Sequence, residues 1–154
     1  MTTMRFINIR SAVALCLLLA GVPTSLLAQA AQPTRIEPAD LVKAIQLPVA
    51  QRPLVLQIGF RVMFQQAHIP GSEYLGPGAD ATAVEQLRKR MQPVARDKFV
   101  VLYCGCCPWD RCPNIAPAVK ALAAMGFKNV KLLYIPTDFG TDWAAKGYPV
   151  QKGS

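Results

Sequence analysis

Four of the five cysteines in this sequence fall within nine residues. A disulfide framework normally spreads its cysteines, because a bridge stabilises most when it closes a long loop. Bridges inside this cluster would close only very short loops. The pattern therefore indicates thiol chemistry or metal binding rather than a stabilising framework, and the residues concerned are Cys104, Cys106, Cys107 and Cys112.

The spacing is compatible with three uses of the cluster. Cys104 is the candidate catalytic nucleophile, since it comes first in the loop and directly follows an apolar stretch. Cys107 and Cys112 could form a disulfide, or relay redox equivalents by resolving an oxidised Cys104. All four thiolates could instead hold a soft ion, Cu or Zn, although structural zinc usually uses two separated cysteine pairs. The first use, which we prefer, requires no metal or other cofactor.

The rest of the loop is a candidate binding site for a small anion. Backbone N–H groups of a tight loop form an anion-binding nest, and Arg111 is the best placed charged side chain. Trp109 could shape an anion pocket or only cover the loop, and Asp110 could cap the helix that follows. We therefore expect a substrate loop made of Gly105, Cys106, Cys107, Trp109, Asp110, Arg111 and Cys112.

The single histidine, His68, invites the interpretation of a cysteine–histidine catalytic pair. It begins the segment His68-Ile-Pro-Gly71, which is typical of a turn because proline fixes φ and glycine permits positive φ. We expect a structural hydrogen-bonding role for His68, and a place in the core for Trp143.

Apolar runs predict the strands that must position this loop. The strongest runs from Phe99 to Tyr103 without polar alternation, so both of its faces should be covered, as in a central parallel strand. Further strands are expected over Leu54–Ile58 and Val130–Ile135. Ala31 to Arg35 is expected to be only a polar lead-in.

Helical patterns alternate with these strands. One helix should open at Pro38, and a second at the capping-box pattern Thr82 to Glu85. A third should start with Pro113 at its first position and end at Gly126, and a last short one should run from Thr141 to Lys146. This alternation predicts an α/β fold with a central parallel sheet and helices on both faces. Ligands of such sheets bind beyond the carboxyl ends of the strands, where Cys104 lies.

The first thirty residues have the order of a secretory signal peptide. Arg5 and Arg10 precede a short apolar run, and Ala28-Gln-Ala30 is a small-x-small cleavage site. We expect residues 1–30 to be removed, leaving one domain over 31–154 without a membrane span, in the periplasm or secreted. That chain carries 15 Lys and Arg, after Arg5 and Arg10 are subtracted from 17, against 9 acids, a net charge of +6. Such a charge suits anionic small substrates, while export argues against nucleic acid.

Three stretches of the chain together resemble a rhodanese-like domain. The first is a strand ending near Gln57, followed eleven residues later by His68-Ile-Pro-Gly71. The second is the apolar strand that ends in Tyr103-Cys104, with its helix closing at Gly126-Phe127. The third is Trp143, followed by Gly147-Tyr-Pro-Val150. The resemblance covers roughly residues 36–152.

The resemblance implies a sulfurtransferase that moves a sulfane sulfur through a persulfide on Cys104. The partners would be a small anionic donor such as thiosulfate and a thiol or other nucleophilic acceptor. The chain departs from the family at Gln57 and Gly59, where an Asp and an Arg are common, with Arg61 a candidate substitute for the arginine. Its cysteine loop is also longer, interrupted by prolines and richer in sulfur than the family's catalytic loop.

Overall fold

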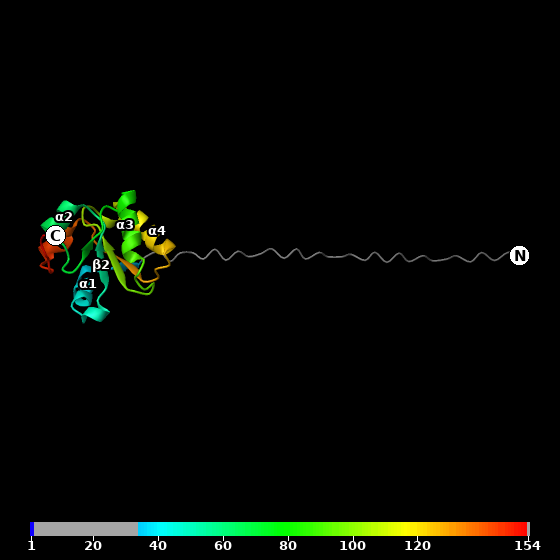
Figure 1. Ribbon diagram of the computed structural model, residues 1–154, viewed down its shortest axis with the longest axis horizontal. Helices are drawn as coiled ribbons and strands as arrows, with labels where there is room; N and C mark the ends of the chain where they lie inside the picture. Colours follow the sequence, from blue (N-terminus) through cyan, green and yellow to red (C-terminus); the bar gives the residue numbers. More distant parts are fainter. Residues whose placement is uncertain (2–33, 154) are drawn as a thin grey trace.

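The computed structural model of the chain describes Met1 and residues 34–153. Within them, one five-stranded parallel sheet has the strand order β1-β5-β4-β2-β3 (Figure 1). Its strands are β1 (Thr34–Ile36), β2 (Leu54–Gln57), β3 (Glu73–Tyr74), β4 (Val100–Tyr103) and β5 (Val130–Leu133). The helices are α1 (Pro38–Ile45), α2 (Arg61–Gln66), α3 (Ala81–Met91), α4 (Ile115–Ala124) and α5 (Phe139–Asp142), with 3-10 turns η1 (Val49–Gln51), η2 (Trp109–Arg111) and η3 (Ala144–Lys146). The predicted α/β class and parallel sheet are confirmed.

Helices cover both faces of the sheet, because successive side chains of β4 point to opposite sides. Val100 and Leu102 pack with the buried faces of α3 and α4, which lie side by side in Figure 1. Val101 and Tyr103 pack on the other face with Leu41 of α1 and with α5. The helices on both faces of the sheet therefore pack against β4.

The strand β4 lies between β2 and β5 and pairs with both in parallel. All four of its residues are buried, as the unbroken apolar run predicts. Because the chain leaves β4 directly into Cys104, the cysteine loop starts at the carboxyl end of the best-covered strand of the sheet.

Two sequence predictions are wrong, one about the first strand and one about the last helix. Thr34–Ile36 forms the edge strand β1, paired with β5, although Thr34 and Arg35 are exposed and read as a polar lead-in. The expected last helix is broken at Trp143, whose φ of −120° and ψ of −65° interrupt it. It becomes the separate turns α5 and η3, and the second ends at Gly147, as expected.

Two helix starts also differ from their predictions. The cap of α3 is Asp80, whose carboxylate accepts from the backbone N–H of Thr82, so Thr82 is not the capping residue. Pro113 does not occupy the first position of α4, which begins two residues later, after the cap residue Asn114. The backbone carbonyl of Cys112 accepts from the N–H of Ile115, so the loop turns once more before the helix begins.

The predicted signal peptide and its cleavage after Ala30 fall, apart from Met1, outside the described residues. Between residues 34 and 153, no helix has both the length and the apolar character needed to span a bilayer.

Candidate active site

Cys104 is the first residue after β4 and is 3% exposed. Its sulfur lies 3.2 Å from the side-chain nitrogen of Asn114, which donates a hydrogen bond to it. The same sulfur lies 3.1 Å from the Cys106 sulfur. The Cys104 sulfur therefore lies where the end of β4, the cysteine loop and the start of α4 come together.

The loop turns sharply at Gly105, whose φ of +85° is a conformation that residues with a Cβ rarely adopt. A Cβ at this position would also stand 3.0 Å from the Cβ of Phe139. The turn is held by the N–H of Phe139, which donates to the carbonyl of Gly105 at 3.0 Å. Further along, the N–H of Trp109 donates to the carbonyl of Ile135 at 3.1 Å. The loop is therefore fixed to the segment that follows β5.

This fold brings together all four thiols of the loop. The four sulfur atoms lie within 4.8 Å of one another, and each cysteine is free. Cys104 and Cys112 are buried, while Cys106 and Cys107 are half-buried, with 3.3 Å between the sulfurs of these two neighbours. The sequence grouped these residues, and the structure places their sulfurs in a single cluster.

The surroundings of the Cys104 thiol favour its ionised form. Its pKa is lowered to about 5, chiefly by the Cys112 thiol that donates to it. The backbone N–H and thiol of Cys106 and the amide of Asn114 add to this effect, against the opposing effect of burial. Burial, followed by its two thiol neighbours, raises the pKa of Cys106 to about 12. The pKa of Cys112 is also raised, first by its hydrogen bond to Cys104.

Asn114 is a site residue that the sequence reasoning missed. Its side chain is 2% exposed, and its oxygen accepts from the backbone N–H of Ala79 at 3.0 Å while its nitrogen faces Cys104. Asn114 occupies the N-cap position of α4 without a side-chain hydrogen bond to the helix, and the helix dipole favours negative charge at this end. The available signal was its place at a helix start, two residues after the last cysteine of the loop.

The two departures from the family pattern form one arrangement around Cys104. The Gln57 side chain donates to the Cys104 carbonyl, with 3.1 Å between nitrogen and oxygen. A Cβ at Gly59 would lie 2.7 Å from that carbonyl oxygen and 3.0 Å from the Cys104 sulfur. The absence of a side chain at Gly59 therefore makes room for the Gln57 amide and for Cys104. Arg61 lies over the ring of Tyr74 instead, 4.3 Å from its centroid.

The remaining side chains of the predicted substrate loop, those of Trp109, Asp110 and Arg111, are more exposed than Cys104. Trp109 is half-buried, and the Arg35 guanidinium lies 5.2 Å from its ring centroid. Arg111 and Asp110 are exposed in η2. Asp110 does not cap α4, contrary to the prediction, because it lies within η2 and the N-cap position of the helix is taken by Asn114.

His68 and Trp143 have structural environments. His68 is buried, its Nδ1 lies 2.7 Å from the carbonyl oxygen of Phe64, and its ring stacks on the Phe64 ring. Its backbone pairs with Gln151 near the carboxyl terminus, which lies close to α2 in Figure 1. Trp143 is fully buried, and its indole N–H donates to the carbonyl of Pro149.

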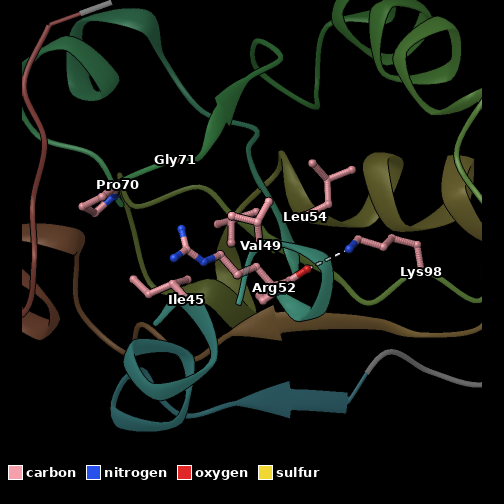
Figure 2. A pocket seen from close by; sticks show the side chains of 9 residues that line it. Ile45, Val49, Arg52, Leu54, Pro70, Gly71 and Lys98 are labelled. Atoms are coloured by element: carbon pink, nitrogen blue, oxygen red, sulfur yellow. Dashed lines mark hydrogen bonds between the residues drawn. The ribbon is translucent and has the colours of Figure 1, made fainter. Parts of the chain in front are cut away.

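A hollow of about 270 Å³ borders the amino end of β2 (Figure 2). It is bordered by Leu54 at the start of β2, by Pro70 and Gly71, and by Arg52 and Lys98. The Lys98 amine donates to the carbonyl of Arg52 at 2.8 Å. Because it borders the amino ends of the strands, this hollow is separate from the thiol cluster.

The fold and the thiol site define a parallel α/β domain with a buried cysteine directly after its central strand. No protein-family description and no curated protein sequence matches the chain. Solved structures do match, and the fold that they share with this chain is the rhodanese-like fold.

Three of these structures illustrate the likeness. The rhodanese-like domain of the Anabaena Alr3790 protein has a TM-score of 0.55 at 18% identity, covering 79% of this chain and 80% of that one. The BH2092 protein of Bacillus halodurans has a TM-score of 0.59 at 20% identity, covering 77% of each chain. A thiosulfate sulfurtransferase from Pseudomonas aeruginosa has a TM-score of 0.57 at 24% identity, covering 81% of this chain and 20% of that enzyme.

Proposed function

We propose that this protein is a sulfurtransferase that carries sulfane sulfur as a persulfide on Cys104. The observation that carries the proposal is the setting of the Cys104 sulfur. It lies at the carboxyl end of β4, accepts a hydrogen bond from Asn114, and belongs to the thiol whose pKa is lowered to about 5. Such a thiol is a thiolate at neutral pH, which is the form that attacks sulfur.

The reaction has two displacement steps. The Cys104 thiolate attacks the outer sulfur of a donor such as thiosulfate, and a new sulfur–sulfur bond forms. The bond inside thiosulfate breaks, and sulfite leaves with its electron pair. A thiol or another nucleophile then attacks the outer sulfur of the persulfide, and Cys104 leaves again as the thiolate.

The surroundings of the loop suit an anionic donor. Arg35 and Arg111 contribute exposed positive charge, and the expected net charge of +6 attracts anions over a longer range. The half-buried Cys106 and Cys107 form the more exposed side of the cluster, from which a small donor would reach Cys104. The fold shared with a thiosulfate sulfurtransferase supports the same substrate class. We propose a periplasmic or secreted setting for this reaction.

Turnover of thiosulfate tests this function. The reduced, metal-free protein should release sulfite when a small thiol or cyanide is supplied as acceptor. We expect Cys104→Ser to lose at least about a hundredfold in rate, because the hydroxyl cannot form a persulfide. Lys120→Ala, on the exposed side of α4, is the control and should keep its rate. Sulfite release that survives Cys104→Ser would overturn the assignment of Cys104.

A further inference from the structure

The four thiols of the cysteine loop do more than surround Cys104. We propose that Cys104, Cys106, Cys107 and Cys112 together bind one thiophilic d10 metal ion, with Zn(II) and Cu(I) as the two ions of this chemistry. The proposal goes beyond sulfur transfer and rests on a separate observation. That observation is the convergence of four free sulfur atoms within 4.8 Å of one another.

The spacing of the sulfurs fits a four-coordinate site. Zn–S bonds are about 2.3 Å long, so four sulfurs on a tetrahedron around the ion lie about 3.8 Å apart. The contacts of Cys106 with Cys104 and with Cys107 are 3.1 and 3.3 Å, and every other pair lies within 4.8 Å. Small rotations of the side chains would therefore centre an ion between them.

The loop backbone holds the sulfurs in place independently of any bond between them. Its anchors are the positive φ of Gly105, the bond from Phe139 N–H to Gly105, and the bond from Trp109 N–H to Ile135. A bridge between the sequence neighbours Cys106 and Cys107 would be strained. Ligands fixed in advance by the backbone lose little freedom when they bind an ion.

The chemistry around the sulfurs favours a soft ion over a hard one. Soft thiolates select Zn(II) and Cu(I), whereas Mg²⁺ and Ca²⁺ require oxygen ligands. The only acid in the loop sequence, Asp110, is exposed and is not part of the cluster. Asn114 donates to the Cys104 sulfur, as outer-shell donors do around metal thiolates.

Metal binding and sulfur transfer would exclude each other, because both use the Cys104 sulfur. A site closed by four thiolates leaves no position for substrate, as in structural zinc sites. The metal-bound protein should therefore take up no sulfur from thiosulfate until the ion is removed. The rate of sulfur transfer would then depend on how much Zn(II) or Cu(I) is available to the protein.

Metal titration of the reduced, chelator-stripped protein tests the site. Zn(II) is titrated against a chromophoric chelator, and Cu(I) separately against a bathocuproine chelator. We expect one ion per chain, and Co(II) in the same site should give the intense sulfur-to-cobalt absorption of a thiolate complex. Whichever of Zn(II) and Cu(I) binds with this stoichiometry identifies the ion. Failure of both to bind would overturn the proposal.

Variants separate this site from the proposed function. Cys107→Ser, in a half-buried position, and Cys112→Ser, in a buried one, should each weaken binding at least about tenfold. Lys120→Ala, an exposed change on α4 outside the loop, is the control and should bind like the parent protein. Binding that is unaffected by Cys107→Ser, in a protein with an unchanged circular dichroism spectrum, would contradict the four-thiol site. Sulfur loading is read on the metal-free protein, so either proposal can fail while the other stands.

Discussion

The side-chain amide of Asn114 connects two parts of the fold at the sulfur of Cys104. Its nitrogen donates to Sγ at 3.2 Å, while its oxygen accepts from the backbone N–H of Ala79 at 3.0 Å. Only the amide oxygen can accept from the Ala79 N–H, so the N–H₂ group must face the sulfur. The amide is thus oriented to stabilise a thiolate.

Replacing Asn114 with alanine should make Cys104 a weaker acid. A hydrogen bond to a charged group is worth about 1.5–3 kcal/mol, so the pKa of Cys104 should rise by roughly one to two pH units. The rate of alkylation at Cys104, followed by mass spectrometry across a pH series, measures this change. Asn129→Ala, an exposed change of the same kind, is the control. An identical pH profile for Asn114→Ala and the parent protein would show that the amide does not stabilise the thiolate.

The ionisation of Cys104 should also make folding stability depend on pH. Its pKa is about 5 in the folded chain, compared with about 8.5 for an unfolded cysteine. A group with a lowered folded pKa stabilises the fold above its unfolded pKa, and this contribution is lost as pH falls through the folded pKa. The free energy of unfolding of the reduced, metal-free protein should therefore decrease from about pH 8.5 to about pH 5.

Chemical denaturation of the parent protein and of Cys104→Ser at several pH values measures this contribution. Carboxylates titrate in both proteins, so the difference between them isolates Cys104. We expect the variant to show a flatter dependence in this range. Parallel curves would contradict a lowered pKa at Cys104.

Gly59→Ala should disturb the site without touching the loop sequence. The added methyl group would meet the Cys104 carbonyl at 2.7 Å and the Gln57 amide nitrogen at 2.8 Å. Overpacking of this kind costs about 1–3 kcal/mol, and the displaced strand end should slow alkylation of Cys104. Denaturant unfolding and alkylation kinetics together check this. Gly140→Ala is the control, because its only near neighbour is a side-chain oxygen of Asp138, and it should keep the alkylation rate.

Trp143 should contribute to stability rather than to chemistry. It is fully buried, stacks on Phe139, packs against Tyr148 and donates to the carbonyl of Pro149. Trp143→Ala should lower the free energy of unfolding by about 3–5 kcal/mol, measured by denaturant titration. The half-buried Trp109 is the comparison, and Trp109→Ala should lose less. A loss for Trp143→Ala no larger than that of an exposed substitution would mean that the core around α5 does not depend on Trp143.

The central elements of this fold were predictable because their residues are apolar in patterns that indicate burial. The unbroken apolar run of β4 indicated a strand covered on both faces, and its end located Cys104. The edge strands β1 and β3 have only three and two residues, and neither is fully buried. Hydrogen bonds to neighbouring strands define them, and a single stretch of sequence does not contain those neighbours.

Of the site, the sequence indicated the residues that are close together in the chain and missed the contacts made by distant ones. The four cysteines are close in sequence, so grouping them required no fold. Gln57 is 47 residues away from the Cys104 carbonyl to which it donates. Asn114 and Gly59 likewise belong to the site only through contacts that the sheet and α4 create. Such contacts follow from packing, so they could not be read from residue types and spacing.

The most direct test of the account is to locate the sulfur atom that thiosulfate delivers. The reduced, metal-free protein is incubated with thiosulfate, its remaining thiols and any persulfide are alkylated, and the loop peptide is fragmented in a mass spectrometer. We expect one added sulfur on Cys104, with none on the loop peptide of Cys104→Ser. A loop peptide without added sulfur, or with the sulfur on Cys106, Cys107 or Cys112, would contradict it.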